Sequence, residues 1–165
     1  MSAPPPSLIS TSGRIVTTDA AITWRAQLGA PLVFTNGVFD LLHPGHVEYL
    51  ESARSLGGYL VVGINTDRSA RVLGKESNRP VMDQRARARV IAGLASVDRV
   101  VLFDEPTPLE LILALGPDVL VKGGDYSRET IVGAAQVEAR GGRVVVVPLT
   151  PGYSTTALVE RCRAS

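Results

Sequence analysis

Five apolar runs alternate along this chain with segments of helical periodicity, and this alternation constrains the fold more than any other feature. The runs are rich in Val, Ile and Leu without alternating polar residues, as expected of parallel strands covered on both faces. They lie at residues 32–36, 59–65, 99–103, 118–121 and 143–147. The helical segments that follow them lie at residues 45–56, 83–95, 107–115, 129–140 and 154–163. The sequence therefore predicts a Rossmann-like α/β domain around a doubly wound, five-stranded parallel sheet.

The chain of 165 residues is long enough for one domain with its own hydrophobic core. Residues 1–12 are dominated by Pro and Ser and are predicted to be a disordered lead, so that residues 13–165 form the domain. Within the domain, Thr18 and Asp19 can cap a short helix that Gly29 ends.

Composition restricts the class of partner and the compartment. The formal net charge is only +1, so no surface for a polyanion such as nucleic acid is indicated. No apolar stretch is long enough to span a bilayer, and the N-terminus lacks the basic and apolar parts of a signal peptide. The single cysteine, Cys162, leaves no disulfide framework and fits a reducing compartment. We therefore expect a cytoplasmic protein that binds small molecules, without a membrane partner.

Doubly wound sheets bind ligands outside the carboxyl ends of their strands, so the loops after the strands should hold the functional residues. These loops lie at residues 35–46, 65–80, 103–106, 122–128 and 148–155.

Both histidines of the chain, His43 and His46, stand in the loop after the first predicted strand, separated by Pro44 and Gly45. A helix that starts here exposes unpaired N–H groups and the positive end of its dipole, which suit a phosphate. Pro44 fits the first helical position, and Gly45 allows a phosphate to approach the backbone. Capping or packing roles are the alternatives, as is a zinc pair, for which no second Cys/His cluster exists.

Two segments resemble the signatures of one enzyme superfamily. Residues 35–46, with the sequence Thr-Asn-Gly-Val-Phe-Asp-Leu-Leu-His-Pro-Gly-His, resemble the first signature of the cytidylyltransferase-like nucleotidyltransferases. Residues 152–156, Gly-Tyr-Ser-Thr-Thr, resemble the second signature, at the start of the last predicted helix. Ser154 and Thr155 can cap that helix while their hydroxyl and N–H groups reach the β- and γ-phosphates; a helix cap alone is the alternative.

The closest resemblance within the superfamily is to the bacterial heptose-1-phosphate adenylyltransferases, from about residue 14 onward. It is carried by residues 78–81 and 84–85, by Thr107-Pro108 and by the segment Val-Lys-Gly-Gly-Asp-Tyr at residues 121–126. It implies ATP as co-substrate, a sugar phosphate as acceptor, Mg²⁺ held mainly by the nucleotide rather than by protein ligands, and a homodimer.

The resemblance also implies roles for individual residues. Nucleotide binding is assigned to Thr35, Asn36, Gly37, Val38, Phe39, Gly45, Arg79, Gly152, Tyr153, Ser154, Thr155 and Thr156. Catalytic roles are assigned to His43, His46, Lys75 and Arg85. Sugar-phosphate binding is assigned to Asp40, Lys122, Gly124, Asp125 and Tyr126, with helix capping as the alternative for Asp40 and a solvated turn for Lys122 and Asp125. Arg85 stands where a cation opposes a helix dipole, which predicts a ligand or an acidic partner nearby.

One departure favours adenylyl over cytidylyl transfer. Glycerol-3-phosphate cytidylyltransferases carry arginines where this chain has Leu149 and, approximately, Ala95. Cytidylyl transfer to glycerol 3-phosphate, or nucleotidyl transfer to another small phosphorylated acceptor, is an alternative. A non-catalytic nucleotide-binding regulatory module is another.

The predicted chemistry needs no enzyme nucleophile. The acceptor's phosphate oxygen would attack the α-phosphorus of ATP in line and expel pyrophosphate, so that catalysis rests on positioning and charge stabilisation. His43 and His46 would donate hydrogen bonds to the phosphates, and the helix start at Ser154 would hold the leaving pyrophosphate. Lys75 and Arg79 would close over the triphosphate.

Overall fold

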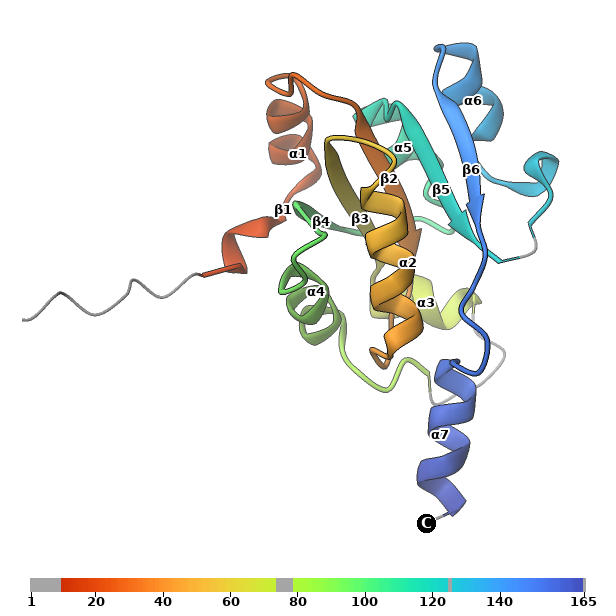
Figure 1. The fold of residues 1–165 in the computed structure, drawn as a ribbon. Helices are drawn as coiled ribbons and strands as arrows, with labels where there is room; N and C mark the ends of the chain where they lie inside the picture. Colours follow the sequence, from red (N-terminus) through yellow and green to blue (C-terminus); the bar gives the residue numbers. More distant parts are fainter. Residues whose placement is uncertain (1–9, 74–78, 125, 165) are drawn as a thin grey trace, which may run out of the picture.

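The computed structural model describes residues 10–73, 79–124 and 126–164, which form one α/β domain around a parallel sheet (Figure 1). The described strands number six, in the order β1-β4-β3-β2-β5-β6. Their bounds are β1 Ile15–Val16, β2 Leu32–Gly37, β3 Tyr59–Asn65, β4 Arg99–Phe103, β5 Val119–Gly123 and β6 Arg143–Val147. The predicted fold class is confirmed, but the predicted count of five strands is wrong.

The additional strand is β1, which joins the sheet at its edge. Its two residues pair in parallel with β4, Ile15 with Val100 and Val16 with Val101. A two-residue strand shows no periodicity in the sequence, and only its pairing defines it. The structure also extends β5 to Gly123, so that Lys122 lies within a strand rather than in the following loop.

Seven α-helices surround the sheet in the described part of the chain. They are α1 Thr18–Arg25, α2 Pro44–Arg54, α3 Asp67–Leu73, α4 Gln84–Ala92, α5 Leu109–Leu115, α6 Ala134–Ala139 and α7 Thr155–Ala164. Short 3₁₀ helices occupy Ser12–Arg14 and Arg128–Thr130. Ser12–Arg14 straddles the predicted boundary between lead and domain, and residues 1–9 lie outside the described part.

Two of these helices differ from the sequence expectation. Helix α3 occupies part of the predicted 65–80 loop and begins after Thr66, whose hydroxyl accepts a hydrogen bond from the Ser69 N–H at 3.2 Å. Helix α6 is shorter than the predicted 129–140 segment because Gly133 has a positive φ of 85° and interrupts it. A Cβ on Gly133 would also lie 2.8 Å from the Ile112 side chain.

The sheet is covered on both faces, which explains its unbroken apolar strands. One core cluster joins Val33 and Leu60 to Leu50 of α2 and Ile91 of α4. The other joins Phe34 of β2 to residues of α1, α5 and α6. Successive residues of β2 thus face opposite layers, as in any extended strand.

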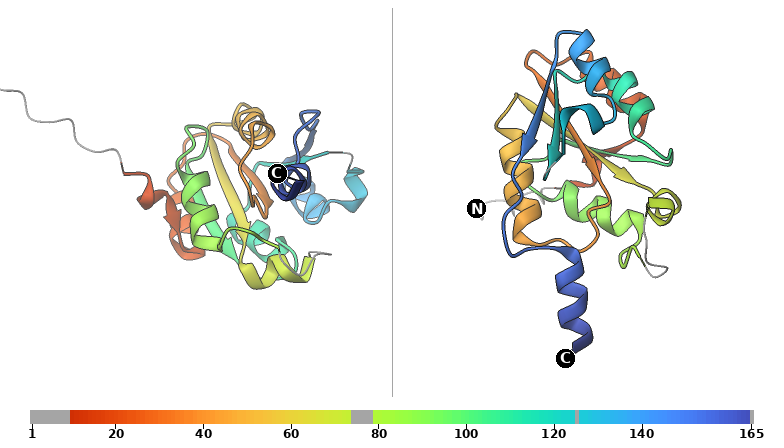
Figure 2. Two further views of the ribbon diagram at one scale, coloured as in Figure 1. Left: turned by 90° about the horizontal axis from the view of Figure 1, so that it is seen from below. Right: turned by 90° about the vertical axis from the view of Figure 1, so that its right-hand side faces the viewer.

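The topology creates a crevice between β2 and β5. From β2 the chain continues to β3 and β4 on one side, and then crosses to β5 and β6 on the other. Ligands of such sheets bind at this switch point, outside the carboxyl ends of the strands. In Figures 1 and 2, β2, β5 and β6 all run toward the first turn of α7, which projects beyond the body of the domain. The described residues of α7 include none that is buried.

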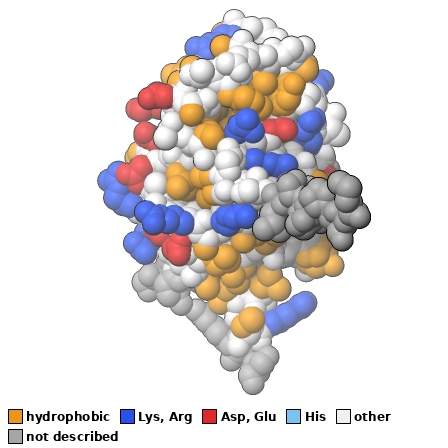
Figure 3. Space-filling model, turned by 90° about the vertical axis from the view of Figure 1, so that its left-hand side faces the viewer, with side chains coloured by type: hydrophobic (Ala, Val, Ile, Leu, Met, Phe, Trp, Pro, Cys, Tyr) orange, Lys and Arg blue, Asp and Glu red, His pale blue; other side chains and the backbone are white. Residues whose placement is uncertain are grey.

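The surface agrees with the near-neutral composition. On the face shown in Figure 3, basic side chains are interspersed with acidic and apolar ones. Within the described ranges, none of the helices has the length and apolarity needed to cross a membrane.

Candidate active site

The two histidines lie together at the start of α2. His43 is the N-cap residue of this helix, Pro44 occupies its first turn, and the rings of His43 and His46 stack with centroids 3.8 Å apart. The Nδ1 atoms of both rings are buried and have no hydrogen-bond partner among the described residues. Buried polar atoms are nearly always paired, so two adjacent unpaired nitrogens indicate a place for a ligand.

Burial also keeps these imidazoles neutral. Burial and, to a smaller extent, the neighbouring His43 lower the pKa of His46 to about 4, against the opposing effect of a hydrogen bond with the Leu41 backbone. Burial likewise lowers the pKa of His43. A neutral imidazole carries one N–H donor, so each ring donates to an anion from Nδ1 only in the tautomer that holds its proton there, or once it is protonated.

A strained turn holds His46 in place. Phe39 has a φ of 49°, a left-handed conformation that is uncommon for a residue other than glycine. Its ring meets His46 edge-on, with centroids 5.4 Å apart. Gly37 leaves room for this ring, because a Cβ at that position would lie 3.0 Å from it. Strain of this kind concentrates at functional sites.

Gly45 is needed for the packing of the site as well. A Cβ on Gly45 would lie 3.1 Å from His43 Nδ1 and 3.3 Å from the Tyr153 Cβ. The His43 and Tyr153 rings are nearly parallel, with centroids 6.2 Å apart. This glycine therefore lets the segment before α7 approach the histidines closely.

Asp40 binds protein backbone. It is only 4% exposed, and it accepts hydrogen bonds from the Val81 and Met82 N–H groups at 2.9 Å. Arg79 Nε lies 3.1 Å from the same carboxylate. The sequence predicts sugar-phosphate binding or a cap on α2 for Asp40; in the structure its carboxylate ties the 79–82 segment to the β2–α2 loop, and sugar-phosphate binding stays a prediction.

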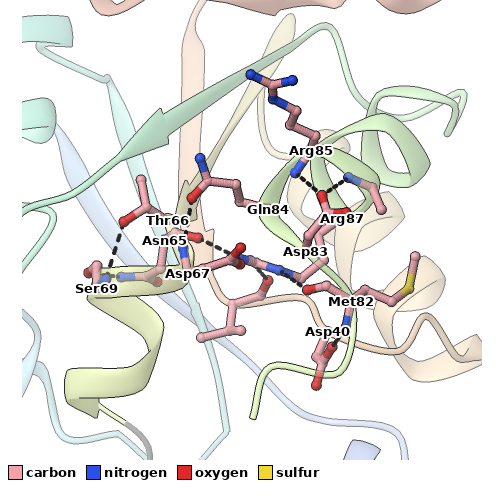
Figure 4. Close-up of polar contacts among 12 residues, drawn as sticks. Asp40, Asn65, Thr66, Asp67, Ser69, Met82, Asp83, Gln84, Arg85 and Arg87 are labelled. Carbon is pink, nitrogen blue, oxygen red and sulfur yellow. Dashed lines mark hydrogen bonds and ion pairs between the residues drawn. The ribbon is translucent and has the colours of Figure 1, made fainter. Parts of the chain in front are cut away.

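The capping residue of α4 accounts for the cation Arg85 at the start of this helix. Asp83 caps this helix by accepting hydrogen bonds from the Arg85 and Ala86 N–H groups at 2.8 and 2.9 Å. These bonds, and to a smaller extent the Arg85 charge, lower the pKa of Asp83. The acidic neighbour that the sequence suggested is thus the capping carboxylate. Arg85 itself is exposed, and Figure 4 shows its guanidinium directed away from these polar contacts.

At the crevice, Lys122 of β5 donates a hydrogen bond to the Asn36 side chain of β2. Burial lowers the pKa of Lys122 to about 8. The adjacent residues face the other layer: the Thr35 hydroxyl lies 2.6 Å from the Tyr49 hydroxyl, and a Cβ on Gly123 would lie 3.0 Å from the Tyr49 ring. Strand alternation therefore places Lys122 and Asn36 on the opposite face of the sheet from Tyr49.

The N-terminus of α7 completes the site. Ser154 Oγ accepts a hydrogen bond from the Ala157 N–H at 3.1 Å, which confirms its predicted role as a helix cap. The first turn of α7 lies beside the histidines, since Thr155 shares two cavities with His46.

Two cavities flank His46 and are named here by one residue each. The Asp40 cavity, of about 400 Å³, is lined by Val38, Phe39, Asp40, His46, Ala70, Leu73, Arg79, Pro80, Thr155 and Thr156. The Tyr49 cavity, of about 230 Å³, is lined by His43, Gly45, His46, Tyr49, Leu149, Thr150, Tyr153, Ser154 and Thr155. Two cavities that meet at one imidazole can bring two substrates together.

The comparisons with known proteins agree with this geometry. The family described as cytidylyltransferase-like matches residues 34–161, which include the histidine pair and the first turn of α7. The chain belongs to the cytidylyltransferase-like family. The superfamily and reaction class predicted from the two signatures, nucleotidyl transfer, are thereby confirmed.

Curated relatives share this domain as part of longer proteins. The chain is 58% identical over 146 residues to the bifunctional protein HldE of Acidiphilium cryptum, which covers 88% of this chain and 30% of that protein. It is 56% identical over 138 residues to HldE of Hyphomonas neptunium, covering 84% of this chain and 28% of the relative. The chain thus spans less than a third of the length of these two relatives.

A solved structure matches along almost its whole length. The lipopolysaccharide core biosynthesis protein from Thermoplasma volcanium superposes with a TM-score of 0.60 at 32% identity, covering 74% of this chain and 98% of that chain. The two proteins therefore share a fold, and the matched protein is the shorter one.

Some of the predicted site residues line the two cavities, and others do not. The β2–α2 loop, Arg79 and the first turn of α7 line the two cavities. Tyr126 is 54% exposed and lines neither of them. Gly124, with a φ of 106°, lies against Leu149 at the Tyr49 cavity. Lys75 and Asp125 lie outside the described residues.

Sequence reasoning missed Arg87, which is 0% exposed beside the Asp40 cavity. A signal was present, since Arg87 and Ile91 are four residues apart and so share a face of α4. An arginine on an apolar helix face indicates a buried guanidinium with fixed partners.

Proposed function

We propose that this domain transfers the adenylyl group of ATP to a heptose 1-phosphate, giving ADP-heptose and pyrophosphate. The observation that carries the proposal is the meeting of two cavities at His46 and Thr155, beside two buried imidazole nitrogens without partners. The acceptor is supported by the resemblance of residues 78–85 and 121–126 to the heptose-1-phosphate adenylyltransferases. A relative described as a lipopolysaccharide core biosynthesis protein is consistent with it.

The nucleotide is assigned to the Tyr49 cavity. Tyr49, Leu149 and Tyr153 offer aromatic and aliphatic walls to a base, and the Gly123–Gly124 backbone lies against Leu149. Leu149 stands where glycerol-3-phosphate cytidylyltransferases carry an arginine that contacts the nucleotide, which supports the same assignment. From this cavity the phosphates would extend past the histidines to the N–H groups of α7, where the dipole favours an anion.

The sugar phosphate is assigned to the other side of His46. The Asp40 cavity carries Arg79, and Lys122 faces away from Tyr49 at the same end of the sheet. A lysine and an arginine are suitable donors to an acceptor phosphate. The acceptor oxygen would then face the α-phosphorus with pyrophosphate leaving toward Ser154 and Thr155, which is the in-line arrangement that phosphoryl transfer requires.

The enzyme's own contribution is positioning and hydrogen bonding. The attacking phosphate oxygen needs no deprotonation, so no general base is required. The imidazoles of His43 and His46 would donate hydrogen bonds to the phosphates as negative charge accumulates in the transition state. Arg85 and Lys75 stay predictions as catalytic residues.

Mg²⁺ is proposed to be bound by phosphate oxygens and water. Asp40, the buried carboxylate of the cavity, already accepts from Val81, Met82 and Arg79. Within the described ranges, no group of three or more His, Cys, Asp or Glu residues could hold a metal ion. When bound, the cation would neutralise phosphate charge.

A homodimer and a cytoplasmic location are proposed on family resemblance and composition. Light scattering coupled to size-exclusion chromatography tests the first, with a mass of 35 kDa expected for two copies of the 17.5 kDa chain. A single-copy mass at micromolar protein would reject the dimer.

The reaction is tested by measuring pyrophosphate release from ATP or CTP with a panel of phosphorylated acceptors. The panel contains both anomers of heptose 1-phosphate, glycerol 3-phosphate and a phosphopantetheine precursor. We expect release with ATP and one heptose 1-phosphate, and none without acceptor. Turnover with CTP and glycerol 3-phosphate would establish the alternative, and binding of ATP without turnover on any acceptor would indicate a regulatory module.

A further inference from the structure

We propose that Arg87 is a positioning residue, which fixes the walls of the Asp40 cavity without touching a substrate. Its kinetic consequences rest on the proposed function, whereas its effect on the histidines does not.

Arg87 makes four polar contacts from a fully buried position (Figure 4). Nη1 donates to the Val38 carbonyl at 2.6 Å, and Nε donates to the Met82 carbonyl at 3.0 Å. Nη2 donates to the Asn65 carbonyl at 2.9 Å and to Asp67 Oδ1 at 2.8 Å. The guanidinium is therefore satisfied by protein and is not among the residues that line the cavity.

These contacts join three separate stretches of chain at the carboxyl edge of the sheet. Val38 belongs to the loop after β2, Asn65 ends β3, Asp67 begins α3, and Met82 precedes α4. Asp40 holds the same 79–82 segment by accepting from the Val81 and Met82 N–H groups. Arg87 thus donates to the Met82 carbonyl, and Asp40 accepts from the Met82 N–H, so both polar groups of this residue are held.

The consequence reaches the histidines through Phe39. Val38 immediately precedes the left-handed Phe39, whose ring lies against His46. Holding the Val38 carbonyl therefore fixes the turn that orients His46, and holding Met82 fixes Arg79 on the opposite wall. A displacement of about 1 Å between such groups can reduce a rate about 100-fold.

Lysine cannot replace this arginine. A guanidinium offers five donors in a planar fork, whereas an ammonium group offers three donors from one atom and cannot reach all four partner atoms. Arg87→Lys keeps the charge and most of the volume, so it isolates the effect of the fork.

Arg14→Lys is the matched control. Arg14 also donates three hydrogen bonds to backbone carbonyls, those of Ala92, Leu94 and Val97, at the end of α4 remote from the cavities. Both substitutions should lower the melting temperature. Only Arg87→Lys should lower kcat/KM, by about 100-fold, when both variants are measured well below their melting temperatures.

A second measurement does not depend on activity. The chain has two histidines, so NMR titration resolves both imidazole pKa values directly. We expect the His46 pKa to move from its wild-type value toward 6.5 in Arg87→Lys, because the Phe39 ring and the burial it provides shift. Arg14→Lys should leave it unchanged.

Two outcomes would overturn the proposal. One is an unchanged His46 pKa in folded Arg87→Lys; the other is an equal loss of kcat/KM in the two variants, which would indicate stability alone. If Arg87→Lys does not fold, Asp67→Asn weakens one of the four contacts and should move both readouts in the same direction by less. If the wild type turns over no acceptor, the proposed function fails while the titration still decides the role of Arg87.

Discussion

The two walls of the Asp40 cavity differ in whether their buried polar groups have hydrogen-bond partners. Asp40 and Arg79 line one wall and Arg87 lies behind it, and the buried Arg87 guanidinium and Asp40 carboxylate both have partners within the protein. On the other wall, His46 and the His43 ring stacked behind it each bury an unpaired Nδ1 atom. The difference indicates a rigid support facing a surface built for a ligand. Buried polar groups stay unpaired in a native protein at a cost, which a bound phosphate can remove.

The largest effect should come from the unpaired wall. His46→Ala removes a preorganised donor and should lower kcat/KM by a factor corresponding to at least ~2–3 kcal/mol of transition-state stabilisation. The fold should persist, because Nδ1 has no partner in the protein and the substitution removes only the hydrogen bond of His46 with the Leu41 backbone. Steady-state pyrophosphate release and circular dichroism check the two parts. Wild-type turnover in a folded variant would contradict the role of the histidine pair.

A substitution on the wall with paired polar groups should lower the stability of the protein instead. Asp40→Ala leaves the Val81 and Met82 N–H groups and the Arg79 cation without their acceptor, and should lower the free energy of unfolding by about 3 kcal/mol. The control is Asp19→Ala, at an exposed position in the first turn of α1. Urea denaturation measures the free energy of unfolding of both variants. A loss of activity at unchanged stability would make Asp40 a substrate ligand, as the sequence alone suggests.

The pH dependence of stability tests the burial of the histidines independently of activity. The pKa of His46 is about 4 in the folded protein and 6.5 for an unperturbed histidine, so the unfolded state takes up more protons between these values. Stability should therefore fall as the pH decreases from about 6.5 to about 4, with a contribution of the same sign from His43. His46→Gln should flatten this slope. A slope identical to the wild type would show that His46 is not buried as described.

The smallest expected effect is a change in KM, which should differ between substitutions on the two faces of the sheet at the crevice. Lys122→Met should raise KM for the sugar phosphate about tenfold while changing KM for ATP little, since its charge lies on the acceptor side. Leu149→Arg, on the Tyr49 side, should do the reverse. Equal changes in both Michaelis constants would reject the division of substrates between the cavities.

The lysine adds a pH signature to the same test. Burial lowers the pKa of Lys122 to about 8, so it loses its positive charge as the pH rises through that value. The kcat/KM for the sugar phosphate should decrease above pH 8, because this parameter reports the ionisation of the free enzyme. Lys122→Met should lack that decrease. Its persistence in the variant would assign the titration to another group.

Local patterns explain the parts of the fold and site that the sequence predicts. Five strands were predicted to within two residues of their bounds, because unbroken Val, Ile and Leu runs mark buried parallel strands. The helix starts at Pro44 and Ser154 were also predicted, since a proline or a capping hydroxyl acts within one turn. Strand β1 and helix α3 were missed because short elements carry little periodic signal.

The sequence by itself determined the parallel sheet, the position of the histidines at a helix start and the reaction class. Only the tertiary structure decided what the polar residues around them bind. Asp40 reaches Val81 across 41 positions, and Arg87 reaches Val38 across 49. Periodicity and capping act over neighbouring residues, whereas these pairings depend on which strand ends the topology brings to one edge. For that reason the histidine pattern at the helix start was visible in the sequence, and the buried Arg87 with its partners became visible only in the folded chain.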